Sequence, residues 1–166
     1  HFTADADMKG SVPFMKVNAI TGEVIWKHTE NVNTKDHVSG GVQATALLGQ
    51  KNISDLVIVP FSRTPDKDNG VLLALDKATG AVRWQFNMEK YTWSSPVAVY
   101  GASGHADIIV CEGSDTGGKV FLLDGKTGVL LNTFDAEKNI EASPAVYGNM
   151  LVFGTRGMKI WGVKIS

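Results

Sequence analysis

The chain has 166 residues, of which 43% are hydrophobic and 20% are charged, and its formal net charge is −1. A chain of this length and composition folds around a sizeable core, so disordered and fibrous proteins are excluded. The near-neutral charge, with a pI of about 6.5, argues against nucleic acid or an anionic membrane as the main partner. No apolar run approaches the roughly 20 residues that cross a bilayer, which argues against a transmembrane segment.

Residues 1–13 are polar and show no periodicity, so the sequence predicts an irregular N-terminal segment. Asp5 and Asp7 suggest a cation loop, but calcium needs six or more oxygens at defined spacing. We therefore interpret the pair as part of a solvated terminus. The single cysteine, Cys111, excludes an internal disulfide and is expected to be a small buried apolar residue.

From Phe14 onward the chain repeats one pattern: an apolar strand, a turn that ends in Thr-Gly, and a second strand. The copies read FMKVNAITGEVIW, VLLALDKATGAVRW and VFLLDGKTGVLLN, and their turn glycines are 58 and 48 residues apart. A second motif, SSPVAVYG, recurs as ASPAVYG with its proline again 48 residues on, and VQATALLG is a degenerate copy. A period in the forties predicts a propeller or another repeat array.

One repeat unit contains four short strands rich in β-branched and aromatic residues, here called A to D. In the clearest unit we expect them at residues 97–100, 107–112, 119–123 and 129–134. The predicted fold is therefore an all-β propeller of four-stranded antiparallel blades. We expect a partial ring over residues 14–166, with two full blades and part-blades at both ends, at about 14–26, 42–86, 95–134 and 142–166.

Each turn between strands C and D has a chemical rationale. The side chain of Asp76 can accept backbone N–H bonds in an Asx turn, and Gly80 can supply the positive φ of a tight hairpin. Trp26 and Trp84 each follow the turn glycine by four residues, and we expect each ring to wedge between neighbouring blades. The repeat residues that we expect to be structural are Thr21, Gly22, Trp26, Asp76, Thr79, Gly80, Trp84, Asp124, Thr127 and Gly128.

The pattern of an apolar strand, Asp-x-x-Thr-Gly, three residues and Trp resembles the repeat of the pyrroloquinoline-quinone-like (PQQ-like) β-propellers. That superfamily includes quinoprotein alcohol dehydrogenases and many non-enzymatic secreted or lipid-anchored propellers. The resemblance runs from Phe14 to the C-terminus and departs at Asn18, which replaces the turn Asp, and at Asn132, which replaces the Trp. The change to Asn132 removes the ring that is expected to form the wedge in the other copies, although Phe134 could fill part of the volume.

The resemblance also implies a cofactor that the residues do not support. The enzymes of that superfamily hold PQQ with a calcium ion, carboxylate and Asn ligands and a catalytic Asp, and they often have adjacent cysteines. This sequence has no Cys-Cys pair and no acidic residue that can be matched to those roles. We therefore predict no catalytic, cofactor-binding or metal-binding residue.

Two full blades are too few to close a ring. We expect the chain to be the C-terminal portion of a longer propeller, in which the remainder supplies a fourth strand to the last blade. The alternative is that a second copy of the chain completes the ring.

The D-to-A and B-to-C connections of a propeller share one face, and the two longest predicted connections, residues 27–41 and 62–70, are of this kind. Extra loop length on one face marks the expected recognition surface, although surface loops also vary freely because insertions cost little. The two histidines there are nine apart, which is not metal-ligand spacing, and residues 66–70 are interpreted as an ordinary turn. The candidate recognition residues are His28, Asp36, His37, Arg63, Asp66, Asp68 and, in the last B-to-C turn, Arg156, which with Arg63 would attract anions.

Three functions remain open. Repeats without a catalytic constellation favour a non-catalytic binding or scaffolding propeller that takes a protein, peptide or glycan on its loop face. One alternative is part of a quinone-dependent dehydrogenase-like enzyme whose catalytic residues lie outside this chain, and another is a purely architectural module. The resemblance implies an extracellular or cell-surface location.

Overall fold

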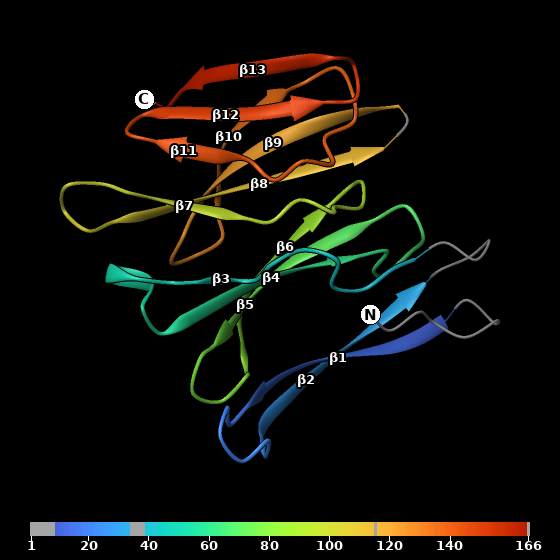
Figure 1. The fold of residues 1–166 in the computed structure, drawn as a ribbon, viewed down its shortest axis with the longest axis vertical. Helices are drawn as coiled ribbons and strands as arrows, with labels where there is room; N and C mark the ends of the chain where they lie inside the picture. Colours follow the sequence, from blue (N-terminus) through green and yellow to red (C-terminus); the bar gives the residue numbers. More distant parts are fainter. Residues whose placement is uncertain (1–8, 34–38, 115, 166) are drawn as a thin grey trace.

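The structure, a computed structural model, describes residues 9–33, 39–114 and 116–165. These ranges hold thirteen strands in four antiparallel sheets and one 3₁₀ turn (η2, Lys51–Ile53), and they contain no α-helix. The sheets are stacked one upon another in chain order, from the N-terminal hairpin to the C-terminal sheet (Figure 1). Each sheet is one blade, as the repeat predicts.

The blades follow one topology, in which each strand pairs with its neighbour in sequence. The first blade is a hairpin of β1 (Lys9–Val17) and β2 (Val24–Asn33). The second contains β3 (Leu47–Leu48), β4 (Leu56–Ser62), β5 (Gly70–Asp76) and β6 (Val82–Met88). The third contains β7 (Val97–Tyr100), β8 (Ala106–Ser114), β9 (Gly117–Asp124) and β10 (Leu130–Asp135). The last contains β11 (Ala145–Tyr147), β12 (Met150–Thr155) and β13 (Lys159–Lys164).

The N-terminal hairpin is longer than predicted, and two expectations are corrected. β1 begins at Lys9, so the described part of the segment expected to be irregular pairs with β2 from Lys9↔Asn33 onward. β2 continues to Asn33, so the first half of the expected loop 27–41 is strand. The pairing is stable because Val12 and Val32 face the second blade and are buried there.

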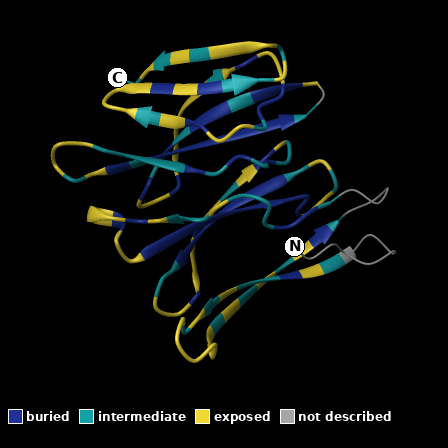
Figure 2. Ribbon diagram, viewed as in Figure 1, coloured by how far each residue is buried: buried dark blue, intermediate teal, exposed yellow. Residues whose placement is uncertain are grey.

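The core consists of three apolar clusters, each lying between two neighbouring blades. Strands β4 and β8 lie at the centre of the stack and are buried on both faces, whereas the outer strands alternate (Figure 2). On β8, for example, Ile108 and Val110 face the second blade, while Ile109 and Cys111 face the last blade. Cys111 is buried as expected, and burial raises the pKa of its thiol to about 12.

The C-to-D turns form as predicted. The Oδ1 atom of Asp76 accepts the N–H groups of Ala78 and Thr79, both at 2.9 Å, and Asp124 accepts the equivalent pair in the next blade. Asn18 accepts the same bonds in the first hairpin, so the change from Asp to Asn preserves the turn. In every C-to-D hairpin the register then shifts by one residue just before the position of the tryptophan. Such a bulge redirects the following side chain.

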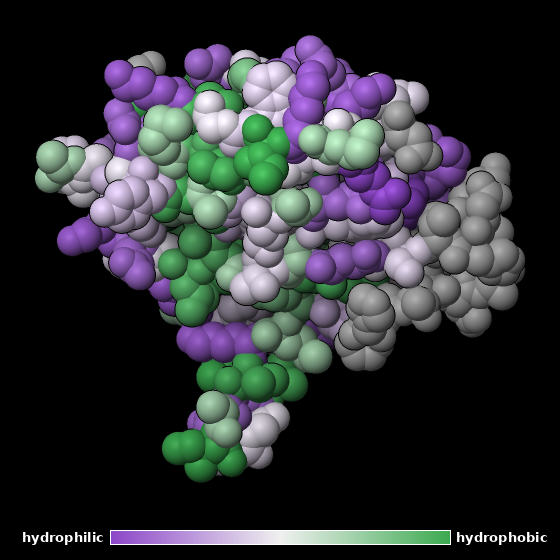
Figure 3. All heavy atoms as spheres, turned by 45° about the horizontal axis from the view of Figure 1, so that its top comes forward, coloured by the Kyte–Doolittle hydropathy of each residue, from purple (hydrophilic) through white to green (hydrophobic). Residues whose placement is uncertain are grey.

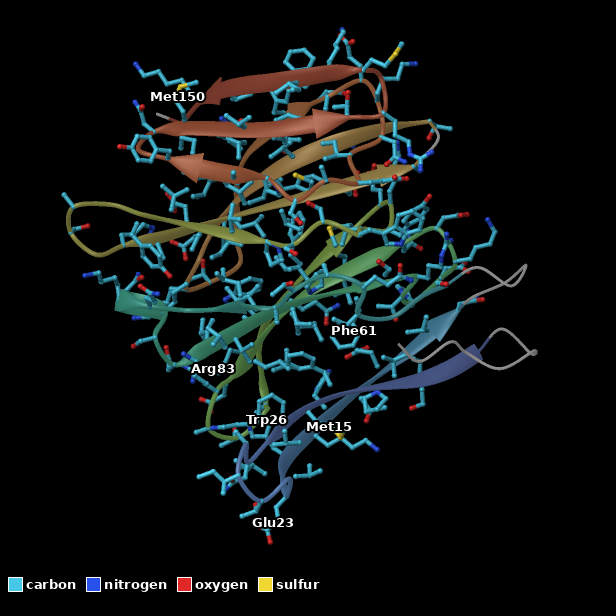
Figure 4. The ribbon with its side chains drawn as sticks, in the orientation of Figure 1. Met15, Glu23, Trp26, Phe61, Arg83 and Met150 are labelled. Atoms are coloured by element: carbon cyan, nitrogen blue, oxygen red, sulfur yellow. The ribbon has the colours of Figure 1, made fainter. Side chains whose placement is uncertain are left out.

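Two of the three copies place a tryptophan at that redirected position, and each ring reaches the next blade. Trp84 donates its Nε1–H to the carbonyl of Gly125 at 3.1 Å and covers Gly128, where an added Cβ would lie 2.6 Å from the ring. Trp26 likewise donates its Nε1–H to the carbonyl of Lys77, and its ring covers Gly80. Figure 4 shows Trp26 and Phe61 in the space between the N-terminal hairpin and the second blade. The predicted wedge is confirmed.

A series of hydroxyl groups links the innermost strands of successive blades. The backbone N–H of Thr45 donates to Oγ of Ser95 at 3.0 Å, and the N–H of Ser95 donates to Oγ of Ser143 at 3.0 Å. These three residues occupy equivalent positions at the start of strand A. The serines of the second motif therefore bond blade to blade.

Large apolar side chains are exposed at the two ends of the stack. At the N-terminal end they belong to the β1–β2 hairpin, including Ile20 at 95% exposure, and at the C-terminal end they include Tyr147 at 92% and Ile160 at 82%. Figure 3 shows apolar side chains on the end formed by the last blade and at the tip formed by the hairpin. The described residues contain no helix long and apolar enough to span a membrane.

Candidate recognition face

The B-to-C and D-to-A connections contact each other and lie along the right-hand side of the stack in Figure 1. Backbone hydrogen bonds join each D-to-A connection to the end of strand B or to the turn that follows it: Gly41 and Ser62 bond to each other in both directions, Gly113 N–H donates to Tyr91, and Arg156 N–H donates to Asn139. We call this side the mouth face. The predicted B-to-C connection of the second blade spans residues 63–69, between β4 and β5, as expected.

His28 does not lie in a loop. It is on β2 opposite Phe14, its Nε2 atom lies 2.7 Å from Oε1 of Glu30, and its ring stacks edge-on against Phe61. The expectation failed because the polar residues that follow Trp26 read as loop, whereas they alternate on a strand with one face packed. Asp36 and His37 lie outside the described residues.

Arg63 is 7% exposed and serves the structure rather than an incoming anion. Its Nε donates to the carbonyl of Ser39 at 3.0 Å, its Nη1 donates to the carbonyl of Lys67, and its guanidinium carbon lies 4.2 Å from the centre of the Tyr91 ring. Two of its N–H groups thus donate to carbonyl groups, and burial keeps the guanidinium group away from an incoming anion. The prediction that Arg63 and Arg156 together attract anions at the mouth is therefore wrong for Arg63.

The two acidic candidates of the same connection lie on its exposed side. Asp66 accepts the N–H of Lys67 at 2.8 Å and the side-chain amide of Asn33 at 3.1 Å. Asp68 pairs with the ammonium group of Lys67 at 2.6 Å. These contacts close an ordinary turn and tie it to the end of β2, as the sequence interpretation of residues 66–70 suggests.

Arg156 lies in the turn between β12 and β13 and is largely exposed. Its Nε lies 2.8 Å from Oε2 of Glu141, whose other oxygen accepts the amide of Asn139 at 3.0 Å. The turn of the last blade is thus bound to the D-to-A connection beside it. This cluster lies on the mouth face, as predicted for Arg156.

The mouth face also carries an aromatic pair that was not predicted from the sequence. Tyr91 and Trp93 lie in the connection from β6 to β7, both half-buried, with ring centres 5.2 Å apart. The guanidinium group of Arg63 also lies over the Tyr91 ring, so the pair is held in place before any ligand arrives. The signal was present, because a Tyr-x-Trp directly precedes the SSPVAVYG motif, where a propeller connection enters the innermost strand.

A buried carboxyl group contacts the same connection. Glu112 is fully buried near the end of β8, where its Oε2 accepts the N–H of Lys90 at 3.0 Å. Its Oε1 has no hydrogen-bond partner among the described residues. Burial raises the pKa of this carboxyl group, and the Lys90 bond only partly opposes the shift.

A groove of about 460 Å³ opens next to the mouth face between β2 and the second blade. Amide side chains contribute much of its lining, among them Asn31, Asn69, Gln85 and Asn87. The amide of Gln85 donates to Oδ1 of Asn87 at 2.7 Å. Paired amides of this kind suit a ligand with its own hydrogen-bonding groups, such as a peptide backbone.

The described residues offer no calcium site of the kind that the resemblance implies. Among the described residues, no group of three or more His, Cys, Asp or Glu side chains could hold a metal ion. His105 approaches two carboxylates, Asp107 at 3.2 Å and Asp124 at 3.4 Å, but its ring is about half exposed and lies at the opposite end of the blade from the mouth face.

Comparison with known proteins shows that the blades are PQQ-like repeats of a β-propeller. Residues 67–166 match the protein family described as outer membrane protein assembly factor BamB, and the chain belongs to that family. The solved structure of BamB from Moraxella catarrhalis superimposes with a TM-score of 0.61 at 16% identity, covering 98% of this chain and 48% of that one. This likeness shows the fold.

Among curated proteins, the beta-alanine-activating enzyme of Danio rerio is 29% identical over 98 residues, which are 59% of this chain and 8% of the enzyme. The human enzyme is 27% identical over 77 residues, which are 46% of this chain and 7% of the enzyme. The chain thus spans less than a tenth of the length of these relatives. It spans about half of the BamB structure.

Proposed function

We propose that this chain is a non-catalytic binding and scaffolding segment of a β-propeller, and that it recognises an extended peptide on its mouth face. The observation that carries the proposal is the pair of Tyr91 and Trp93, which is half-buried and in which Tyr91 is held against Arg63. Tyr, Trp and Arg are the residue types that dominate the energetics of protein interfaces.

The surroundings of the pair support a peptide ligand. The amide-lined groove can pair with backbone N–H and C=O groups, and Arg156 with Glu141 adds charge on the adjoining connection. Because Gln85 is bonded to Asn87 and Arg156 to Glu141, these side chains need little ordering on binding. A setting at the cell surface is part of the proposal and rests on the description of the matched family as an outer membrane assembly factor.

Selection from a phage-displayed random peptide library tests the proposal. Peptides enriched on the chain should lose about tenfold or more in affinity for Trp93→Ala, as expected for an aromatic anchor. His105→Ala is the matched control, since that exposed side chain lies at the opposite end of the same blade. Failure to enrich any peptide, or equal binding by the Trp93→Ala variant, would contradict the proposal.

A further inference from the structure

Two of the three interfaces between blades carry the same ion pair near the mouth face. Nζ of Lys119 on β9 lies 3.0 Å from Oε2 of Glu89, and Nζ of Lys159 on β13 lies 3.2 Å from Oε2 of Glu137. In each case the lysine belongs to strand C of one blade, and the glutamate follows strand D of the blade before it. The lysine side chain therefore bridges the two blades at this point.

The interface between the first and second blades has neutral residues at the same two positions. Glu89 follows its turn glycine by nine residues, and Asn31 occupies that position in the first hairpin. Lys119 precedes its turn glycine by nine residues, and Val71 occupies that position in the second blade. The groove of about 460 Å³ opens at this point, and both Asn31 and Val71 line it. The groove thus lies where the later interfaces have a bridging lysine.

The charge of the groove comes from Glu30, which is the one charged residue among the described residues that line it. Its Oε1 atom lies 2.7 Å from Nε2 of His28, and its Oε2 atom has no hydrogen-bond partner among the described residues. The side chain is 27% exposed, so a ligand can reach it. Arg63 and Lys67, the cations of the adjoining turn, are not part of the lining. A partly buried carboxylate in this setting favours a ligand that carries a positive charge.

The other walls of the groove suit an ammonium group on a peptide. An ammonium group has three N–H donors, and the side-chain carbonyl oxygens of Asn31 and Gln85 are acceptors of the kind that it needs. The groove also adjoins the connection that carries the aromatic pair. Gly70 lines the groove, and a Cβ added to it would lie 3.3 Å from Cα of Tyr91. An extended peptide on the aromatic pair can therefore reach into the groove.

We propose that this groove is a specificity pocket for a lysine of the peptide ligand, whose ammonium group binds Glu30 and takes the place that Lys119 and Lys159 occupy in the other interfaces. The ligand supplies the cation that the repeat itself supplies in the later blades. This inference rests on the proposed function, because it specifies the chemistry of the peptide bound at the mouth face. The aromatic pair provides the anchor, and Glu30 provides the charge preference.

Selection from the phage-displayed peptide library, repeated on variants of Glu30, tests the inference. Peptides enriched on the parent chain should share a lysine at a fixed position. Glu30→Gln removes the charge and keeps a side chain that can bond to His28, so this lysine should no longer be enriched. Glu30→Lys should enrich Asp or Glu at the same position, because the charge of the groove is reversed. Glu23→Gln is the matched control, since it removes one negative charge at the exposed tip of the first hairpin (Figure 4).

Isothermal titration calorimetry then measures the preference with a synthetic peptide of the most enriched sequence and its lysine-to-norleucine counterpart, which lacks the ammonium group. The parent chain and Glu23→Gln should bind the lysine peptide about fivefold more tightly than the norleucine peptide. Glu30→Gln should bind the two peptides equally. Trp93→Ala should weaken both peptides alike, because it removes the anchor.

The outcomes separate this inference from the proposed function. Enriched peptides without a shared lysine, or a lysine preference that Glu30→Gln retains, would overturn the specificity pocket and leave the aromatic site in place. A preference that Glu23→Gln also loses would assign it to the net charge of the chain. Failure to enrich any peptide would overturn both. Circular dichroism shows that each variant is folded, and Glu30→Gln carries the test if Glu30→Lys does not fold.

Discussion

The interface between the second and third blades and the interface between the third and last blades derive from the same repeat but are filled differently. In the former, Trp84 is 8% exposed, bonds to Gly125 and covers the turn of the next blade. In the latter, Asn132 stands at that position and a cavity lies beside it. The backbone, the bulge and the Asx turn are the same on both sides. One side chain per repeat thus determines whether the interface between neighbouring blades is filled, which we call a sealed interface, or contains a cavity.

The largest expected effect is that of removing the seal. Trp84→Ala should lower the free energy of unfolding by about 3–5 kcal/mol, since it deletes a buried aromatic ring and leaves a void. Urea denaturation followed by circular dichroism measures this. Trp84→Phe is the control, because it keeps a ring and loses only the bond to Gly125, for about 1–2 kcal/mol. Similar losses for the two variants would mean that the hydrogen bond, and not the ring, seals the interface.

A methyl group placed under the ring should also disturb the seal. Gly128→Ala combines a positive φ of 74° with a Cβ that would lie 2.6 Å from the Trp84 ring. Gly22→Ala has nearly the same φ, 76°, and nothing within 4 Å. The latter should cost about 1–2 kcal/mol for the backbone alone, and the former about 1–3 kcal/mol more from overpacking. Equal costs in denaturant melts would show that the ring moves aside freely.

Restoring the tryptophan should make the two interfaces alike. Asn132→Trp is expected to raise the free energy of unfolding by about 1 kcal/mol, because it fills the cavity with apolar surface. Thermal melts of the variant and the parent chain measure the gain. A fall in melting temperature would mean that the walls of the cavity do not accept the ring, and Asn132→Ala controls for the loss of the amide.

The sealed interface also contains Glu112, which makes its stability depend on pH. The pKa of this carboxyl group is raised in the folded state above its ordinary value of 4.5, so the folded chain holds the proton at a pH where the unfolded chain releases it. The free energy of unfolding therefore falls as the pH rises from 4.5 through the raised pKa. Denaturation midpoints across that range should show this fall for the parent chain and lack it for Glu112→Gln. An unchanged slope in the variant would assign the dependence to another group.

The repeat made much of the fold predictable, because the residues of each turn form their hydrogen bonds with near neighbours in the sequence. Strand β7 has the predicted bounds, and Asp76, Gly80 and Trp84 have the predicted roles. What failed depends on contacts between blades. The strand character of His28 depends on Phe61, a residue thirty-three positions away, and the burial of Arg63 depends on the loop that covers it.

The mouth face was predictable as a region but not as a set of side chains. Local sequence places Arg63 and Arg156 in B-to-C turns, and both are there. Local sequence does not show that Arg63 donates hydrogen bonds to carbonyl groups, or that Tyr91 stacks on its guanidinium group. Those outcomes follow from how the connections of neighbouring blades pack, which has no local signature.

The hydroxyl series from Thr45 through Ser95 to Ser143 gives the stack a direction. Each blade donates an N–H to the oxygen of the blade that follows it, so one end of the series offers a donor and the other offers an acceptor. A blade added head to tail beyond Ser143 would prolong the series. Two stacks that met with the same end would bring donor against donor, so the polarity of these bonds selects one orientation for any assembly along this axis.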